Sequence, residues 1–273
     1  SLPMIVAGTL TGLSVTKLFV AGMVPGLMLG FGMMLVCGSI SRKRSYPKRE
    51  QQGWPERRKA FFGAFWALLM TVIILYGIMG GICTPTEASI LAVVYALIVG
   101  TLVYRELPIK EIPVIVRESA CTTTSILMLI GFANVFAWVL SREQIPTLVA
   151  NAMLGLTQNK YLILLMINIL LLFVGTFMET NAALAILFPT LLGVATKVGV
   201  DPIHFAIITV LNLVLGLTTP PVGVCLFITS TVGKISLGKV AKAVLPFLVV
   251  NLMVLMLVTY CPALTLWLVG LIF

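Results

Sequence analysis

The sequence predicts an all-α integral membrane protein. Its 273 residues are 60% hydrophobic and only 10% charged, with a mean hydropathy of +1.13, a balance that excludes an ordinary soluble domain. The apolar residues form long unbroken runs, whereas transmembrane strands alternate in polarity. Because the basic residues gather at the ends of these runs, the net charge of +9 indicates orientation in a lipid bilayer and not binding to nucleic acid.

The first part of the chain predicts a short helix, a span and a loop. Residues 1–13 are apolar but too short to cross a bilayer, since a spanning helix needs about 20 residues. We expect them to form the second half of a broken helix. Residues 14–40 form the first span, and residues 41–59 form a hydrophilic loop with eight Lys and Arg against two Glu. Four glycines of the span permit close helix contacts: Gly22, Gly26, Gly30 and Gly32.

Residues 60–140 predict three scaffold helices, with an interfacial connector at 105–118 that alternates basic and acidic residues. One segment in this region has all the residues of a helix-start signal. Thr84 fits the N-cap, Pro85 the first helical position and Glu87 the third, where its carboxylate can reach back to the cap. We therefore favour a structural role for Glu87 over a catalytic one.

A polar interruption marks the next region. After a predicted interfacial linker helix at 141–160, the apolar piece from Tyr161 to Val174 has 14 residues, roughly 21 Å of helix, which falls short of a bilayer core. The polar stretch from Gly175 to Asn181 follows, and then a second apolar piece. Residues 161–198 therefore predict a re-entrant hairpin. Two full spans would place the flanking charges on the same sides, so charge does not separate the two readings.

Two prolines interrupt the following span, residues 201–233, before a final span at 240–273. Pro220 and Pro221 lack amide protons, so the carbonyls of Gly216 and Leu217 lose their helical partners. Backbone groups freed within a membrane must be satisfied by protein, water or a ligand. This discontinuous helix is therefore a candidate ion or solute site.

Charge sets the predicted orientation. Alternating the spans places fourteen of the 18 Lys and Arg residues on one side and four on the other. The positive-inside rule then puts the loop at 41–59 in the cytoplasm.

A weak internal match suggests inverted repeats, a design typical of secondary transporters. At an offset of 221 residues, Thr9, Gly12 and Pro25 align with Ser230, Gly233 and Pro246, in segments of opposite predicted orientation. The match places Ser1 where Val222 sits, just after a break. We therefore expect most of the first repeat, with its own break and hairpin, to be missing from this sequence.

The two interruptions offer the oxygen ligands that a sodium ion prefers. The predicted sodium ligands are Gly175, Thr176, Glu179, Thr180, Asn181, Gly216, Leu217, Thr218, Thr219 and Pro220. Free amides from Ala182 onward and after Gly223 are expected to face an anionic substrate. The predicted substrate-binding residues are Thr180, Asn181, Pro221, Gly223 and Ser1. Taken singly, each interruption is equally explained by an ordinary capped turn or a proline kink; together they favour a site.

Other polar residues receive structural interpretations. His204 is interpreted as a polar residue at a helix start and not as a metal ligand, because no second His or Cys accompanies it. Asn134 and Asn168 are expected to form hydrogen bonds between helices. Because the spans hold no Ser/His pair, metal cluster or paired carboxylates, we predict no catalytic residues, no transition metal and no enzyme activity.

Five motifs in order carry a resemblance that extends over the whole chain. They are Pro3-Met4-Ile5-Val6, Thr84-Pro85-Thr86-Glu87-Ala88, Gly175-Thr176-Phe177-Met178-Glu179-Thr180, Asp201-Pro202-Ile203-His204-Phe205 and Gly216-Leu217-Thr218-Thr219-Pro220-Pro221-Val222-Gly223. In these the chain resembles the large membrane subunit of tripartite ATP-independent periplasmic (TRAP) transporters. The resemblance implies a bacterial inner-membrane importer of organic anions, such as dicarboxylates or sialic acid, with an elevator mechanism.

The resemblance also implies co-transported Na⁺, no organic cofactor, a small membrane subunit and a periplasmic substrate-binding protein. The sequence departs from the family pattern at its start, where the first hairpin and first break are absent. Two alternatives stay open. One is a sodium-coupled elevator that takes anions without a binding protein, and the other is a membrane assembly subunit that does not transport.

Overall fold

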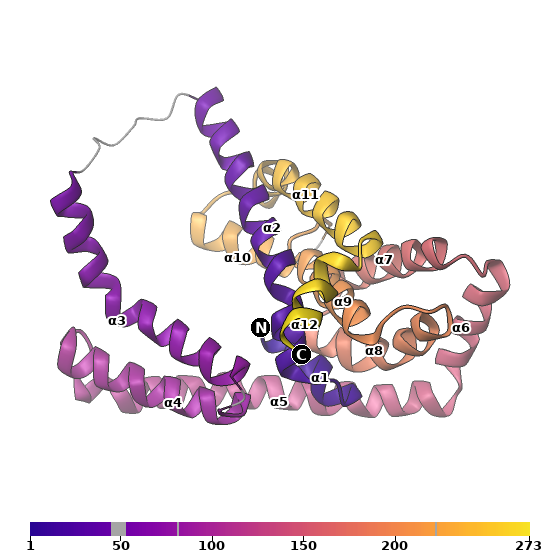
Figure 1. The fold of residues 1–273 in the computed structure, drawn as a ribbon, viewed down its shortest axis with the longest axis horizontal. Helices are drawn as coiled ribbons and strands as arrows, with labels where there is room; N and C mark the ends of the chain where they lie inside the picture. The colour runs from indigo at the N-terminus through magenta and orange to yellow at the C-terminus, as the bar shows by residue number, and fades with distance from the viewer. Residues whose placement is uncertain (45–52, 81, 222) are drawn as a thin grey trace. The chain divides into compact units, whose positions relative to one another are not determined.

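The computed structural model describes the backbone of residues 1–44, 53–80, 82–221 and 223–273, and every regular element in these ranges is a helix (Figure 1). This confirms the all-α prediction. Among the described residues, six helices are long and apolar enough to cross a membrane: Val15–Lys43, Trp54–Ile78, Thr86–Val103, Lys160–Phe177, Thr180–Lys197 and Leu237–Tyr260.

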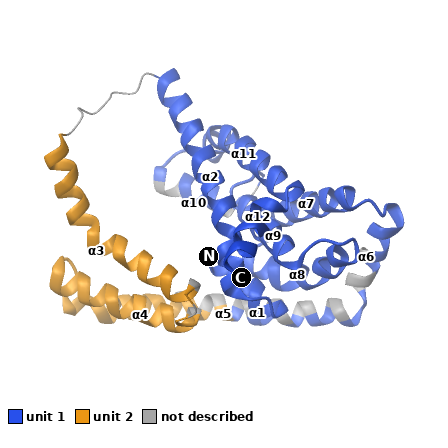
Figure 2. Cartoon of the chain, viewed as in Figure 1, with its two compact units in different colours: residues 1–44, 128–273 blue, residues 45–127 orange. Residues whose placement is uncertain are grey.

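Internal contacts divide the chain into two compact units (Figure 2). Unit 1 comprises Ser1–Arg44 and Met128–Phe273, and unit 2 comprises Ser45–Leu127. Both interruptions predicted from the sequence belong to unit 1, so the candidate site is a property of that unit alone.

Unit 2 contains α3 (Trp54–Met79), α4 (Pro85–Ile98), a π-helical turn η1 (Val99–Val103), a 3-10 turn η2 (Ile109–Glu111) and the first part of α5 (Ile112–Arg142). The capping box predicted at the start of α4 is confirmed. The Thr84 hydroxyl accepts from the Glu87 amide at 3.3 Å, and the Glu87 carboxylate accepts from the Thr84 amide at 2.7 Å. Glu87 is thus held by its own helix start, in agreement with the structural interpretation.

Several helices extend further into the charged segments than the charge pattern suggested. The described part of the predicted loop at 41–59 is mostly helical, because α2 runs to Lys43 and α3 starts at Trp54; residues 45–52 lie outside the described ranges. The predicted connector at 105–118 is also wrong as a separate element, since its second half is continuous with the 31-residue α5. Lys, Arg and Glu are good helix formers, so charge alone does not end a helix.

Unit 1 holds the remaining helices: α1 (Leu2–Thr11), α2 (Val15–Lys43), α6 (Ile145–Leu156), α7 (Lys160–Phe177), α8 (Thr180–Lys197), α9 (Pro202–Gly216), α10 (Val224–Gly233), α11 (Leu237–Tyr260) and α12 (Ala263–Ile272). Its core surrounds α9, which packs against α7, α8, α1, α2, α11 and α12. The stacked rings of Phe188 and Phe205, with centroids 6.0 Å apart, join α8 to α9 inside this core.

The glycines of α2 give a mixed result. A Cβ on Gly22 would meet the Met4 side chain of α1, and one on Gly32 would meet Val250 of α11 at 2.6 Å, so these two glycines permit close packing as predicted. For Gly26 and Gly30 close packing stays a prediction, because a Cβ on either would meet nothing within 4 Å among the described residues.

The final apolar segment is two helices and not the single span predicted at 240–273. α11 ends at Tyr260, and α12 starts at Ala263. Pro262 explains the interruption, because a residue before proline is disfavoured in the helical region, and Cys261 indeed adopts φ −120° and ψ 81°.

Candidate ion and substrate site

The two helices that carry the interruptions, α7 and α9, run side by side in the same direction. Near their starts, the Lys160 ammonium donates to the carbonyl of Gly199, just before α9, at 3.1 Å. Further along, the Asn212 side chain donates to the backbone carbonyl of Asn168 at 2.9 Å and to its side-chain oxygen at 2.8 Å. The expected hydrogen bonding of Asn168 between helices is thereby confirmed. These contacts bring the carboxyl ends of both helices to the same place.

At those ends, the backbones of Gly175 and Gly216 touch. A Cβ on Gly216 would lie 2.6 Å from both the Cα and the carbonyl carbon of Gly175, and one on Gly175 would lie 3.1 Å from the Leu213 oxygen. Both glycines are buried. Those atoms are backbone and cannot give way as a flexible side chain would. Glycine is therefore required at position 216, and a side chain at position 175 would be crowded against the backbone of α9. The predicted hairpin tip and the helix break therefore meet directly.

The threonines around this contact donate to backbone carbonyls of α7 and α9. Thr218 and Thr219 both donate their hydroxyl protons to the Leu215 carbonyl, at 2.9 and 2.8 Å, and Thr176 donates to the Phe173 carbonyl at 2.7 Å. A hydroxyl that donates in this way still has oxygen lone pairs available. The arrangement therefore leaves three hydroxyl oxygens able to act as acceptors or cation ligands.

The break itself differs from the expectation in one respect. α9 ends at Gly216, as the two prolines predict, but the carbonyls of Gly216 and Leu217 are not free. They accept from the amides of Thr219 at 2.9 Å and Cys225 at 3.1 Å, outside the regular helical pattern. The expectation of unpartnered carbonyls is thus wrong, although each oxygen keeps a second lone pair that can bind a ligand.

Gly223 links the break to the hairpin. Its amide donates to the carbonyl of Thr176 at 3.2 Å, and its φ of +54° lies in the left-handed region that favours glycine. A Cβ there would lie 3.0 Å from the Thr219 oxygen and 3.1 Å from the Leu217 oxygen. The carbonyls of Leu217 and Thr219 therefore lie close to Gly223.

The hairpin turn is shorter than the sequence predicted. α7 continues through Phe177 and α8 begins at Thr180, so Gly175 and Thr176 lie in the last turn of a helix of 18 residues, about 27 Å long. The predicted 14-residue piece is therefore wrong, and with it the length argument for re-entry. The sequence missed this because glycine and threonine are tolerated at a helix end that tertiary contacts support.

Glu179 caps α8. Its carboxylate accepts from the amides of Asn181 at 2.8 Å and Ala182 at 3.0 Å, and from the Asn181 side-chain nitrogen at 2.9 Å. The Ala182 amide is thus not free for an anion, and neither is that of Cys225 in α10, which contradicts the expectation of open helix-start amides. Glu179 also fixes which end of the Asn181 amide points toward it.

Two buried oxygens beside Glu179 have no hydrogen-bonding partner in the part of the chain that the structure describes. They are the Thr180 hydroxyl, on a residue 2% exposed, and the Asn181 side-chain oxygen, on a residue 6% exposed. A buried acceptor left unsatisfied costs about 1–3 kcal/mol. These oxygens therefore mark a place where a ligand would be stabilised.

The other predicted residues lie in the same unit. Pro220 is half-buried and Pro221 exposed within the break. Ser1 precedes α1, where its carbonyl accepts from the amides of Met4 and Ile5, and α1 packs against α8 and α9. The structure thus brings Gly175, Thr176, Gly216 and Gly223 into one cluster, while no contact places Ser1 in that cluster among the described residues.

Sequence reasoning missed a buried polar network beneath the site. His204 is in the first turn of α9, as predicted, but it is 1% exposed and bonds to Thr259 and Thr265. Asn212 and Thr259 both bond to Asn168. Polar residues within otherwise apolar runs were the available signal. The side chain of Asn134, the other asparagine predicted to bond between helices, lies outside the description.

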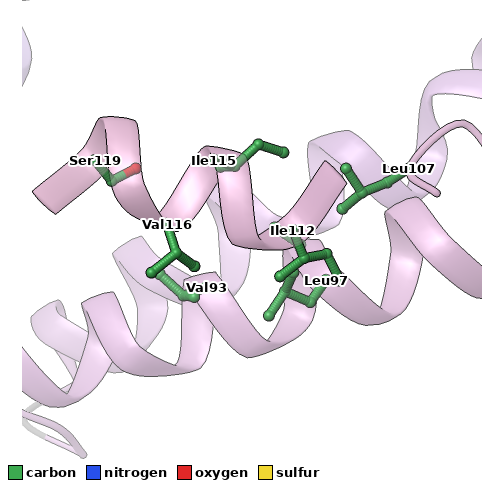
Figure 3. A pocket seen from close by; sticks show the side chains of 8 residues that line it. Val93, Leu97, Leu107, Ile112, Ile115, Val116 and Ser119 are labelled. Atoms are coloured by element: carbon green, nitrogen blue, oxygen red, sulfur yellow. The ribbon is translucent and has the colours of Figure 1, made fainter. Parts of the chain in front are cut away.

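Unit 2 has a cavity of a different kind (Figure 3). It has a volume of about 410 Å³ and lies between α4, α5 and the segment that joins them. It is lined by Val93, Ala96, Leu97, Leu107, Ile112, Ile115, Val116 and Ser119. The nearly complete lack of polar side chains makes it unsuited to an ion or a small anion.

A membrane protein that packs a helical hairpin against a broken helix, with oxygen-rich tips in contact, has the architecture of a secondary transporter. The comparison of sequences defines the family. The family model described as "Tripartite ATP-independent periplasmic transporter, DctM component" matches residues 1–264. The chain belongs to this family of TRAP transporters, as the resemblance predicted.

Several curated relatives are similar over nearly the whole chain. The isethionate TRAP transporter permease protein DctMQ of Oleidesulfovibrio alaskensis is 45% identical over 98% of this chain and 42% of its own length. The C4-dicarboxylate permease DctM of Pseudomonas aeruginosa is 42% identical over 97% of this chain, and the sialic acid permease SiaM of Vibrio cholerae 40% over 97%. The chain spans 62% of the length of each of these two relatives.

Proposed function

We propose that this chain is the C-terminal portion of a large permease subunit that imports organic anions together with Na⁺. One observation carries the proposal: Gly175 and Gly216 touch, which brings the hairpin turn and the helix break together. Both segments are rich in oxygen and poor in charge, as suits a hard monovalent cation. The bacterial inner membrane is the proposed location, with the loop at 41–59 on the cytoplasmic side.

The proposed sodium ligands come from both segments. Thr176, Thr218 and Thr219 have their hydroxyl protons engaged by carbonyls, so their lone pairs can point to a cation. Asn181 adds a buried unpartnered oxygen, which Glu179 orients. The second lone pairs of the break carbonyls complete the proposed shell, and Gly175 and Pro220 supply further carbonyls. Glu179 acts at this site chiefly through Asn181.

An organic anion is the proposed substrate. Three relatives are named for isethionate, sialic acid and C4-dicarboxylates, all of which carry a sulfonate or carboxylate group. In this chain the helix-start amides near the site are largely occupied, so side-chain donors would recognise the anion. The Thr180 hydroxyl is buried and unpartnered among the described residues, which makes it the strongest candidate donor.

An elevator motion of an inverted-repeat fold is the proposed mechanism. Two helix pairs at the predicted offset share features, which supports the repeat. α1 and α10 each have ten residues, and the long helices that follow them, α2 and α11, contain Pro25 and Pro246. The proposed partners are a small membrane subunit and a periplasmic binding protein.

Uptake into proteoliposomes tests this proposal. The complete large subunit would be reconstituted with its small subunit, and uptake of labelled carboxylates and sulfonates measured with and without the binding protein. We expect uptake only with an inward Na⁺ gradient and the binding protein. Equal uptake under a K⁺ gradient would contradict sodium coupling. Uptake without the binding protein would favour a transporter that takes anions directly. If no anion is taken up at all, the result would favour an assembly subunit that does not transport.

A further inference from the structure

His204 lies at the centre of a buried network that joins the candidate site to the end of the chain. Its ring is 1% exposed in the first turn of α9. Nε2 lies 3.2 Å from the backbone carbonyl of Thr259, near the end of α11, and Nδ1 lies 2.7 Å from the hydroxyl of Thr265 in α12. The histidine thus contacts both helices that follow the broken span.

The partners determine the tautomer of the ring. A carbonyl oxygen can only accept, so Nε2 must carry a proton. The Thr265 hydroxyl can donate to Nδ1, which gives a neutral ring with the proton on Nε2. A positive ring would instead need that hydroxyl to accept from Nδ1 and donate to the Pro262 carbonyl at 3.0 Å.

The charged groups nearest the ring are already engaged elsewhere. The carboxylate of Asp201 accepts from the amides of Ile203 and His204 at 2.8 and 3.1 Å, and the Lys160 ammonium donates to the carbonyl of Gly199. The Asp201 carboxylate is thus held by backbone amides and makes no hydrogen bond to the ring, and the positive charge of Lys160 disfavours a second positive charge nearby. An unpaired buried charge is costly. The neutral Nε2–H form is therefore the one that this environment favours.

The backbone carbonyl of Thr259 needs a hydrogen-bond donor from outside its own helix. α11 ends at Tyr260, so the Thr259 carbonyl is one of the last four of the helix, which have no partner within it. His204 supplies the missing donor from α9. The Thr259 hydroxyl meanwhile accepts from the Asn168 side chain of α7 at 2.9 Å. One buried threonine on α11 therefore holds α9 by its backbone and α7 by its side chain.

We propose that His204 is a positioning residue of the transport site, which acts through Thr259 to hold α7 and α9 in register. Asn168 lies two helical turns before Gly175, and its partner Asn212 lies one turn before Gly216. Movement of Thr259 would therefore be passed to the contact between the two glycines. This inference rests on the proposed sodium site.

Two substitutions at His204 separate positioning from simple packing. The amide nitrogen of glutamine can take the place of Nε2, whereas that of asparagine is shorter and reaches only the place of Nδ1. In sodium-driven uptake by the complete transporter, His204→Gln should keep the half-saturating Na⁺ concentration within about twofold of wild type, while His204→Asn should raise it about fivefold, the effect of one lost hydrogen bond. The control Thr265→Val, which leaves the bond to Thr259 intact, should behave like His204→Gln.

Equal sodium dependence of the Gln and Asn variants would overturn the proposal. If His204→Asn does not fold, Thr259→Val provides the second test: it keeps the backbone carbonyl but removes the acceptor for Asn168, and it should raise the half-saturating Na⁺ concentration by a similar factor. An unchanged value would contradict the role of Thr259.

The tautomer gives a readout that does not need transport. In ¹⁵N-histidine-labelled protein, the signal that disappears in His204→Gln should show a protonated Nε2 and an unprotonated Nδ1 at neutral pH. A ring protonated at Nδ1 alone would refute the hydrogen bond from His204 to the Thr259 carbonyl even if transport is sodium-driven, whereas a proton on Nε2 supports it. If the protein shows the predicted tautomer but no sodium-driven uptake, the hydrogen bond from His204 to Thr259 is supported and the proposed function is rejected.

Discussion

The carboxylate of Glu179 accepts a hydrogen bond from the side-chain nitrogen of Asn181 at 2.9 Å, and this contact turns the Asn181 oxygen away from the helix cap. That oxygen is buried and has no partner among the described residues. The acid nearest the hairpin turn is thus already committed to the start of α8. Its contribution to ion binding is, in this account, to orient a neutral ligand.

Replacement of Glu179 tests this division of roles. In Glu179→Gln one oxygen remains to accept from the Asn181 side chain or from the amides, so we expect transport to persist with a half-saturating Na⁺ concentration raised about threefold to tenfold, the effect of ~1 kcal/mol lost. Glu179→Ala should be worse, because the cap is lost as well. Sodium titrations of uptake measure both. Complete loss in the Gln variant would show that the carboxylate binds the ion directly.

Thr219 is the most direct test of a hydroxyl ligand. Thr219→Ala removes an oxygen whose proton is engaged by Leu215, and we expect the half-saturating Na⁺ concentration to rise about fivefold. Thr219→Ser keeps the oxygen and should restore the wild-type value. Thr229→Ala is the matched control, since that hydroxyl donates to the Cys225 carbonyl on an exposed part of α10. The same sodium dependence in the Ala variant and wild type would remove Thr219 from the site.

The sequence correctly predicted those features that depend on residues close together in the chain or on a single buried polar group. Pro220 and Pro221 end α9 because they lack amide protons, and Thr84 and Glu87 form their capping box within four residues. Asn168 was identified because an amide in an apolar helix needs a partner. Each of these follows from groups close in sequence or from a single buried polar group.

The features that failed depend on packing between helices. The carbonyls of Gly216 and Leu217 found amide partners in the irregular segment that follows them, which no sequence pattern specified. Likewise, contact with Gly216 explains why Gly175 belongs to a helix end and not to a loop. The hydrogen bond between Asn168 and Thr259 joins residues 91 positions apart in sequence, so only the fold could reveal it.

Replacing both Pro220 and Pro221 by alanine should restore a continuous helix. With alanine at both 220 and 221, the missing amide donors return, and the helix can continue from Gly216 toward Val224. We expect the double variant to reach the membrane but to lose sodium-driven uptake. Uptake at the wild-type rate, measured against equal amounts of inserted protein, would show that the broken helix is not needed.

Cysteine labelling tests the position of the hairpin turn. Phe177 is 51% exposed and Thr180 only 2%, so in a background without the five native cysteines Phe177→Cys should react quickly and Thr180→Cys slowly. If the hairpin is re-entrant, Phe177→Cys should react with a membrane-impermeant reagent added from the periplasmic side. Reaction from the cytoplasmic side alone would show that α7 and α8 are two full spans.

Binding of ²²Na⁺ to a Gly216→Ala variant tests the central claim most directly. The added methyl would lie 2.6 Å from the backbone of Gly175, so it must force the hairpin and the break apart. Gly193→Ala in α8, where a Cβ meets nothing within 4 Å among the described residues, is the matched control. The account predicts that purified Gly216→Ala protein remains folded and loses saturable ²²Na⁺ binding, while Gly193→Ala binds as wild type does. Undiminished binding by a folded Gly216→Ala protein would contradict a sodium site formed at this contact.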